Sequence, residues 1–303
     1  MALTAAGEGE RHLVIAPAWI GDSAMAAPFF ASLRAALPRA RIEALAGPWT
    51  AGLLGAFPWI DSVRVLEGGA GKGKWRAFLS VRRVAGPGAP EAIWLLPNSF
   101  RAAALARRIG ARRRIGYARD GRGWLLTRPV APPPDSPPPH LVDYYLGLLE
   151  AEGLEAAHRA VRLPVSPEAA RFADRLLADE APAGEGPLIG MHPGAFFGDS
   201  KLWPLESFAA LAVRLAREEG ARVLLLGGPD EIGLAGRVAE AAGGAAVNLA
   251  GRDTLATLPG LLARLRGLVS GDTGPLHAAA LVGTPTVSLF GPTDPRRTAP
   301  RGP

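Results

Sequence analysis

Residues 267–292, GLVSGDTGPLHAAALVGTPTVSLFGP, contain the pattern that decides the fold. A short apolar run ends in the turn Gly271-Asp272-Thr273-Gly274, a helix-like run follows over residues 275–281, and a second apolar run spans residues 285–290. This order predicts a strand, a glycine-rich turn, a helix and another strand. Backbone N–H groups and the positive end of the helix dipole would meet at the turn, which suits a phosphate group.

The carboxylate in this turn adds a second property. Asp272 would repel a phosphate, whereas a carboxylate beside a phosphate site suits sugar hydroxyls, so the pairing suggests a nucleotide-sugar site. In the alternative interpretation, Asp272 or Thr273 merely caps the helix. His277 follows on the same helix, and because no second histidine lies at metal-ligand spacing, a capping or core role is favoured for it.

Strands alternate with helices on both sides of a proline-rich linker at residues 163–167. The expected strands are residues 12–17, 41–46, 62–66, 92–96, 188–192, 222–226 and 246–249. The expected helices are residues 25–36, 100–109, 141–152, 168–179, 205–219, 231–242 and 254–265. This alternation predicts two parallel-sheet α/β domains, residues 1–163 and 164–303.

Ligands of parallel sheets bind at the carboxyl ends of strands, and several polar or glycine-bearing turns fall there. Asp22 follows the first strand and could act as a general base, with Gly21 allowing close approach of a ligand. A helix N-cap is the alternative for Asp22. Asn98 and Ser99 end another strand. Nothing in the chain matches the G-x-G-x-x-G dinucleotide fingerprint.

Two further loops of the second half fit a nucleotide diphosphate. The chain has only three lysines, and Lys201 lies in the loop after residue 192, which also contains Gly194 and Ala195. A lysine there could neutralise charge on a departing diphosphate, or it is a surface side chain. Gly227 permits close approach of a ribose or adenine and Glu231 could bind ribose hydroxyls, although a plain turn fits equally well.

Composition limits the function classes. The 303 residues include no cysteine, which excludes disulfides, thiolate catalysis and cysteine-ligated metal. No apolar run is long enough to span a bilayer, and the first residues do not resemble a secretory signal. The net charge is +6, and residues 101–128 hold nine arginines against one acid, Asp120. Nucleic acid, an anionic membrane and a phosphorylated acceptor are candidate partners, and a solvated basic face is the alternative.

These motifs, in this order, resemble one family, the ADP-heptose–lipopolysaccharide heptosyltransferases of glycosyltransferase family 9, and most of all the heptosyltransferase II branch. The resemblance extends over nearly the whole chain and rests on five segments: APAWIGDSAMAAPFFASLRAALP, WLLPNSFRAAALARRIGARRRIGYARDGRGWLLT, HPGAFFGDSKLWP, LLLGGPDE and NLAGRDTLATLPGLLARLRGLVSGDTGPLHAAALVGTPTVSLFGPTDP.

The resemblance implies a GT-B fold, in which two Rossmann-like domains face a cleft. The first domain would bind the acceptor and the second the ADP-sugar donor. It also implies an inverting transfer of heptose from ADP-L-glycero-D-manno-heptose to the inner core of lipopolysaccharide. A metal-chelating D-x-D motif and a cofactor are not expected, nor is nucleic acid as a partner. The enzyme would act in the cytoplasm, peripherally at the inner membrane, on an acceptor of the lipid A–Kdo type.

The predicted site, which combines the resemblance with the strand-end turns described above, has three groups of residues. Asp22 and Lys201 would be catalytic. The donor would contact Gly194, Ala195, Gly227, Glu231, Asp272, Thr273, Gly274 and His277. The acceptor would contact Gly21, Asn98, Ser99, Arg112, Arg113 and Arg114.

The chain departs from the family in one respect and leaves two other functions open. Family members continue well past the GPTDP segment, whereas this chain ends at Pro303, so the second domain is expected to be shortened. A nucleotide-sugar 2-epimerase on the same fold is one alternative function. A non-catalytic binder of anionic lipid or nucleic acid is the other.

Overall fold

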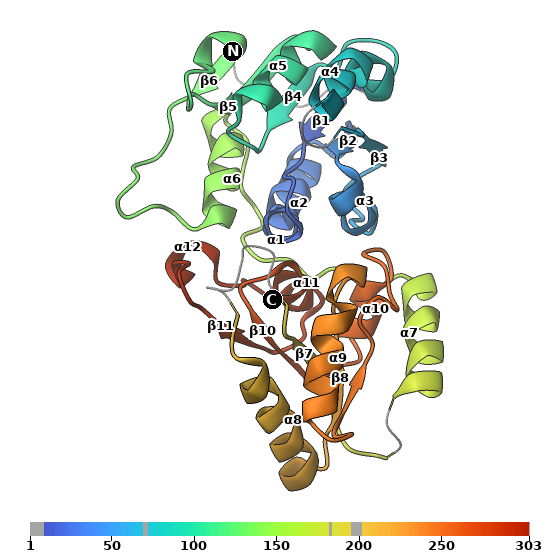
Figure 1. Cartoon of the computed structure of the whole chain (residues 1–303). Helices are drawn as coiled ribbons and strands as arrows, with labels where there is room; N and C mark the ends of the chain where they lie inside the picture. Colours follow the sequence, from blue (N-terminus) through green and yellow to red (C-terminus); the bar gives the residue numbers. More distant parts are fainter. Residues whose placement is uncertain (1–8, 69–71, 182–183, 195–201, 303) are drawn as a thin grey trace. The chain divides into compact units, whose positions relative to one another are not determined.

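The computed structural model describes residues 9–68, 72–181, 184–194 and 202–302, and these form two α/β units (Figure 1). The first unit spans residues 1–161 and the second residues 162–303. The boundary expected from the sequence, after residue 163, lies two residues further along the chain. None of the helices in the described ranges is long and apolar enough to cross a bilayer.

The first unit is built on a parallel sheet of six strands. Their order is β3-β2-β1-β4-β5-β6, the doubly wound order in which the chain starts in the middle and reverses direction once. The strands are β1 (Arg11–Ile15), β2 (Arg41–Ala46), β3 (Ser62–Val65), β4 (Ala92–Leu95), β5 (Arg113–Tyr117) and β6 (Arg128–Val130).

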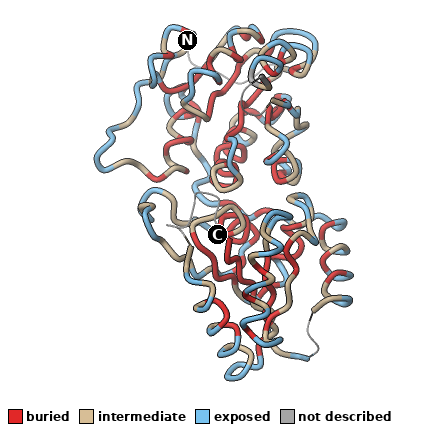
Figure 2. Tube along the Cα trace, viewed as in Figure 1, coloured by how far each residue is buried: buried red, intermediate tan, exposed pale blue. Residues whose placement is uncertain are grey.

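Helices cover both faces of this sheet. The helices are α1 (Ile20–Met25), α2 (Ala27–Ala36), α3 (Pro48–Gly55), α4 (Lys72–Ala85), α5 (Phe100–Ile109) and α6 (Leu141–Ala151), with a 3₁₀ turn η1 (Gly123–Leu125). Helices α4 and α5 pack on each other, as do α2 and α6, and α1 and α3. The core under α4 and α5 joins Leu13, Ile93 and Leu95 of the strands to Val81 and Leu105 of the helices. The buried segments of Figure 2 follow these strands and inner helix faces.

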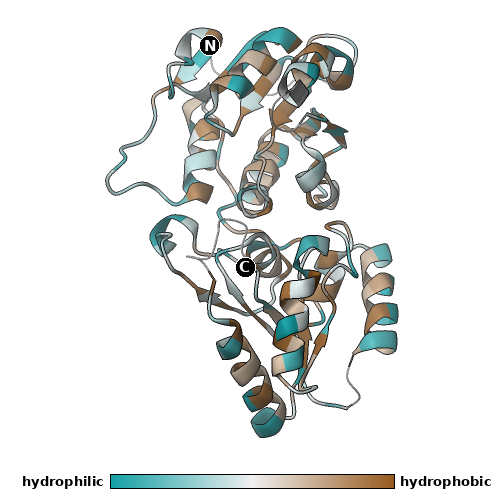
Figure 3. Cartoon of the chain, viewed as in Figure 1, coloured by the Kyte–Doolittle hydropathy of each residue, from teal (hydrophilic) through white to brown (hydrophobic). Residues whose placement is uncertain are grey.

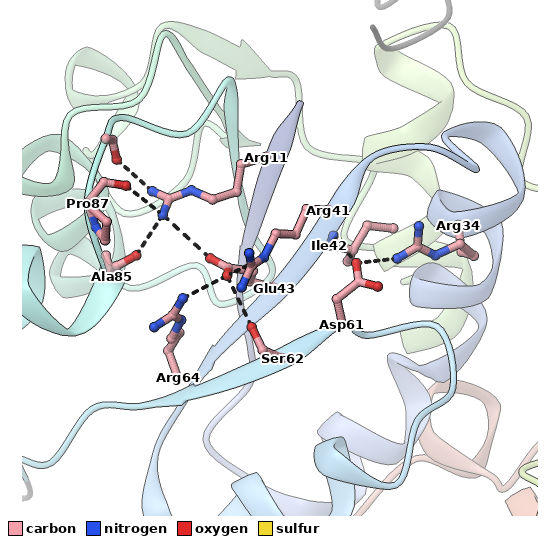
Figure 4. A network of polar contacts seen from close by, with 11 residues as sticks. Arg11, Arg34, Arg41, Ile42, Glu43, Asp61, Ser62, Arg64, Ala85 and Pro87 are labelled. Carbon is pink, nitrogen blue, oxygen red and sulfur yellow. Dashed lines mark hydrogen bonds and ion pairs between the residues drawn. The ribbon is translucent and has the colours of Figure 1, made fainter. Parts of the chain in front are cut away.

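A buried carboxylate holds three neighbouring strands of the first unit together (Figure 4). Glu43 on β2 is fully buried, accepts hydrogen bonds from Ser62 Oγ at 3.1 Å and Arg64 Nη2 at 2.9 Å, and pairs with Arg41 Nε at 3.0 Å. Arg11 Nη1 lies 3.7 Å from its other oxygen. Part of the arginine excess is therefore internal and stabilises the sheet, because a buried carboxylate is tolerated only when it is paired.

The second unit has a parallel sheet of five strands in the order β11-β10-β7-β8-β9. The strands are β7 (Leu188–His192), β8 (Arg222–Leu225), β9 (Ala246–Asn248), β10 (Gly267–Gly271) and β11 (Thr286–Leu289). The helices are α7 (Pro167–Glu180), α8 (Leu205–Glu219), α9 (Ile232–Ala241), α10 (Leu258–Leu262), α11 (Gly274–Val282) and α12 (Pro295–Thr298), with a 3₁₀ turn η3 (Pro229–Glu231).

The core of the second unit lies between the sheet and α8 and α9. Met191, Val223 and Leu225 of the strands pack against Phe208 and Val238 of these helices. Figure 3 shows the corresponding hydrophobic colouring along the strands. Because the strands are covered on both faces, they read as continuous apolar runs in the sequence.

Candidate functional site

The polar side chains of the second unit gather at the carboxyl edge of its sheet. His192 ends β7, Gly227 follows β8, and Gly271 ends β10 and leads into Asp272 and Thr273. Since parallel strands end at one edge, three loops that are distant in the sequence meet here.

Glycines let the carboxylate of Glu231 lie against the backbone of two of these loops. A Cβ atom on Gly194 would overlap the Glu231 carboxylate, and one on Gly227 would lie 3.1 Å from Glu231 Oε2. The backbone N–H of Gly228 donates to the same oxygen over 2.7 Å. The structure thus brings together three predicted donor-binding residues and explains why two of them are glycine.

The environment of Glu231 favours its ionised form. Burial raises the pKa of this carboxyl, but the hydrogen bond and charge of His192 together with the Gly228 N–H outweigh burial, and the pKa lies below its ordinary value. The side chain remains 28% exposed. An ionised carboxylate only accepts hydrogen bonds, so this one is suited to sugar hydroxyls.

His192 links Glu231 to the turn after β10. Its Nε2 lies 3.1 Å from Glu231 Oε2, and its Nδ1 lies 3.2 Å from Thr273 Oγ1 and 3.5 Å from Ser270 Oγ. The two hydroxyls are 2.9 Å apart. When the ring is neutral and donates from Nε2 to the carboxylate, Nδ1 accepts from the Thr273 hydroxyl. The buried histidine therefore sets the positions of one carboxylate and one hydroxyl of the site.

Asp272 and His277 form a second pair. His277 Nε2 lies 3.1 Å from Asp272 Oδ1, and Thr298 Oγ1 donates to Asp272 Oδ2 over 3.3 Å. Both side chains of the pair are less than a tenth exposed. The interpretation of His277 as a plain core or capping residue is incomplete, because its ring holds the carboxylate that the sequence places beside the phosphate turn.

The start of α11 is not capped by the side chain before it. Thr273 occupies the N-cap position, but its hydroxyl is hydrogen-bonded to Ser270 and His192 and accepts nothing from the helix. The alternative in which Thr273 merely caps the helix is therefore wrong. Gly274 is the first helical residue, where the helix dipole favours an anion.

Asp253 is a residue of this edge that the sequence analysis does not single out. It lies in the connection between β9 and α10, and burial raises its pKa from 3.8 to about 6, against the opposing effects of its own backbone N–H and the charge of His192. In the sequence it resembles any surface acid in a loop. Its perturbed pKa depends on packing, which the sequence does not display.

Two predicted site residues, Ala195 and Lys201, lie outside the described residues. Their assignments remain predictions.

In the first unit, Asp22 lies in the first turn of α1, just after β1, and Gly21 precedes it. Trp19 is at the N-cap position of α1, so Asp22 is inside the helix and the N-cap alternative is wrong. The residue is partly exposed at the carboxyl edge of the sheet.

Asn98 and Ser99 lie at the same edge, after β4. Asn98 Nδ2 donates to the Tyr144 hydroxyl over 2.8 Å, and Ser99 Oγ accepts from the backbone N–H of Ala102 over 3.2 Å and caps α5. Both side chains thus have structural contacts, and their contacts with the acceptor stay a prediction.

Arg122, which no sequence motif indicates, organises this loop. It is fully buried, and its guanidinium donates to the carbonyls of Pro97, Ser99 and Tyr117 and to Asn98 Oδ1. Burial lowers the pKa of this guanidinium, with Tyr144 and Asp120 opposing. A buried cation held by carbonyl oxygens fixes the loop between β4 and α5.

The structure does not bring Arg112, Arg113 and Arg114 to that edge. Arg113 and Arg114 begin β5 at the amino edge of the sheet, and Arg112 directly precedes the strand. Arg113 lies 3.7 Å from a Glu91 oxygen and 3.6 Å from a Glu152 oxygen. Arg114 donates to the carbonyls of Ala111 and Leu125. Only Arg112 has a largely exposed side chain, at 81%.

The described residues contain no group of three or more His, Asp or Glu side chains that could hold a metal ion. The expected absence of a metal requirement remains a prediction.

Comparisons with known proteins identify relatives of this chain. The model of glycosyltransferase family 9 (heptosyltransferase) matches residues 83–303. Lipopolysaccharide heptosyltransferase 2 of Salmonella typhimurium is 30% identical over 300 residues, which cover 95% of this chain and 84% of that protein. Lipooligosaccharide heptosyltransferase 2 of Haemophilus influenzae is 32% identical over 302 residues, covering 95% of this chain and 85% of that protein.

Among solved structures, the ADP-heptose lipopolysaccharide heptosyltransferase II of Escherichia coli aligns with a TM-score of 0.79 and 28% identity. The alignment covers 96% of this chain and 88% of that one.

Proposed function

Because the chain belongs to glycosyltransferase family 9 (heptosyltransferase), we propose that it moves heptose from ADP-L-glycero-D-manno-heptose to the inner core of lipopolysaccharide with inversion at the anomeric carbon. Its two parallel-sheet α/β domains have the GT-B fold class of the heptosyltransferases that it matches. The observation that carries the proposal is the polar cluster of the second unit, where two held carboxylates flank the start of α11.

The donor side of the reaction follows from this cluster. The start of α11 at Thr273 and Gly274 would bind the diphosphate, because it offers backbone N–H groups and a helix dipole. Glu231 would accept hydrogen bonds from ribose hydroxyls. Asp272, held by His277 and Thr298, would orient the heptose through its hydroxyls.

The chemical step requires a base and a stabilised leaving group. Asp22 would take the proton of the acceptor hydroxyl as that oxygen attacks the anomeric carbon. Lys201 and the N–H groups at the start of α11 would stabilise the negative charge that grows on the departing ADP. No metal has a part in this scheme, and full turnover in excess chelator is the expected result.

On the acceptor side, the proposal extends to a lipid-anchored, anionic saccharide of the lipid A–Kdo type at the inner-membrane surface. The positive charge of α4 and α5 in the first unit supports an anionic acceptor, since these helices hold eight lysines and arginines and no acid. The enzyme would then be cytoplasmic and peripheral to the membrane.

Calorimetric titration of the full chain with ADP-heptose, ADP, UDP and UDP-GlcNAc tests the proposal. ADP and ADP-heptose should bind, and the uridine nucleotides should bind at least about tenfold more weakly. Preferred binding of UDP-GlcNAc, with turnover that needs no acceptor, would favour the 2-epimerase alternative. Failure to bind any nucleotide, with steeply salt-dependent binding to lipid or nucleic acid, would favour a non-catalytic binder.

A further inference from the structure

Exposed aromatic side chains mark the connections that leave the carboxyl edge of the first sheet. After β1, β2, β3 and β4 come Trp19, Trp49, Trp75 and Phe100, with exposures of 43%, 68%, 64% and 49%. Trp124 of η1 is 70% exposed, and its ring centroid lies 6.1 Å from that of Phe100. Large exposed aromatics on one rim indicate a binding surface, because such area is normally removed from water.

Positive charge accompanies only part of this rim. Helices α4 and α5 together hold eight lysines and arginines and no acid. In contrast, α3, the helix of Trp49, contains no charged residue. The part of the rim on α4 and α5 is therefore both aromatic and cationic.

Helices α4 and α5 present this surface as one unit. Arg108 of α5 donates from Nε to the carbonyl of Phe78 on α4 over 2.7 Å, and its guanidinium lies 5.1 Å from the centre of the Phe78 ring. Trp75 and Leu79 are one turn apart on α4, and Leu79 is 51% exposed. We define the aromatic–arginine face as Trp75, Arg76, Leu79, Arg83, Phe100 and Trp124.

We propose that the aromatic–arginine face docks on an anionic lipid bilayer, with the tryptophan and leucine side chains entering the headgroup region and the arginines pairing with lipid phosphates. Tryptophan is suited to this boundary because it has an apolar ring and a polar N–H. Arginine pairs with phosphate in a bidentate manner while its stem stays in apolar surroundings. Anionic headgroups attract each such cation near the surface.

The composition of the face favours lipid over the other anionic partners. A nucleic acid would gain from the stacked rings and the charges but not from Leu79, which offers aliphatic surface only. A protein partner would have to supply several acids around an apolar centre. A bilayer supplies anionic headgroups and an apolar layer in the same place.

The membrane-facing surface rests on the proposed function only for the cellular membrane at which the enzyme would act. Lipid binding can be measured without turnover, so the two proposals can be tested separately. The test is co-sedimentation of the full chain with vesicles of phosphatidylethanolamine, with and without phosphatidylglycerol. The double variant Trp75→Ala/Trp124→Ala should bind the anionic vesicles at least about tenfold more weakly. Trp49→Ala, which removes an equally exposed tryptophan from the uncharged part of the rim, is the matched control and should bind as the unmodified chain does.

A second variant separates charge from apolar insertion. Arg76→Gln/Arg83→Gln should weaken binding by about fivefold per arginine and flatten its dependence on salt. Both side chains are exposed, so this variant should fold even if the tryptophan variant does not. ADP affinity, measured for every variant, should be unchanged.

Three results would overturn the inference: equal vesicle binding by all variants, equal weakening by Trp49→Ala, or equal binding of the unmodified chain to vesicles without phosphatidylglycerol. Preferential loss of RNA binding in the variants, with vesicle binding intact, would assign the face to nucleic acid instead. If the chain binds anionic vesicles through this face but transfers no sugar, the proposed function fails and the lipid surface stands.

Discussion

The carboxyl edges of the two sheets are built differently. In the second unit, the side chains of the edge hold each other at short range, as His192 does with Glu231 and Thr273, and His277 with Asp272. In the first unit, the buried cation Arg122 holds the backbone of the edge, and large aromatic side chains are exposed along it.

This difference is informative about the two substrates. A small, highly charged nucleotide needs a few groups in fixed positions, because preorganised dipoles stabilise charge most effectively. A large amphipathic acceptor needs a large contact surface on the enzyme instead, with one reactive group at the centre of that surface. Substitutions at either edge test this functional contrast.

The largest effect is expected at the first edge. Asp22→Asn should lower the transfer rate by about 10² to 10⁴, the usual range for losing a general base, and leave ADP affinity unchanged. Steady-state turnover and calorimetry measure the two quantities. A variant that keeps more than about a tenth of the rate would show that Asp22 is not the base.

Substitutions of Lys201 test the donor side, again by comparing turnover with ADP affinity. Lys201→Ala should reduce turnover by about 10² to 10³ at saturating donor, and ADP affinity by much less, since the extra charge appears only as ADP departs. Lys201→Arg should restore part of the rate, because a planar fork replaces a point charge imperfectly. Wild-type turnover by the alanine variant would show that Lys201 is a surface side chain without a role in catalysis.

Asp253 gives a pH-dependent prediction for the second edge. Its folded-state pKa of about 6 lies above the ordinary value of 3.8, so the folded chain prefers the protonated acid and loses stability as the pH rises from 4 through 6. Asp253→Asn should therefore leave the free energy of unfolding unchanged near pH 4 and raise it by up to about 3 kcal/mol above pH 6. Urea denaturation at both pH values measures this change, and equal effects at the two would contradict the assignment.

The smallest effect is expected from splitting the two contacts of His192. In His192→Gln the side-chain amide can replace Nε2 and keep Glu231 in place, whereas in His192→Asn it can replace Nδ1 only. ADP affinity should fall about tenfold in the asparagine variant, the size expected for a lost hydrogen bond to a charged group, and much less in the glutamine variant. Similar ADP affinities for the two variants would show that His192 does not position Glu231.

Much of the fold follows from the sequence where apolar periodicity is strong. Helices α5 and α8 and strand β7 have the bounds expected from the pattern. Helix α3 is missed because the segment PWTAGLLG is short and mostly apolar, and helix α4 is missed because it begins with Lys-Gly-Lys, which is typical of a loop. Strand β5 is missed because it begins with two arginines.

One expected helix is wrong in extent. Residues 254–265 were expected to be helical, but α10 covers Leu258–Leu262 only. Thr254 and Thr257 form a hydrogen-bonded turn before it, and Pro259 fits the first turn of a helix but not its interior.

The site was predictable where a residue type and a strand end coincide, as for Asp22 and Asp272. The roles of His192, Arg122 and Asp253 depend on which loops meet in space and on burial. These properties arise from tertiary packing, so a single sequence does not show them.

Heptose transfer is tested most directly by the mass spectrum of a lipid-linked Kdo acceptor after incubation with the full chain and ADP-heptose. The acceptor should gain a single heptose, with one ADP released per heptose transferred and none released without acceptor. An unchanged acceptor, or consumption of ADP-heptose at the same rate when acceptor is omitted, would contradict heptose transfer.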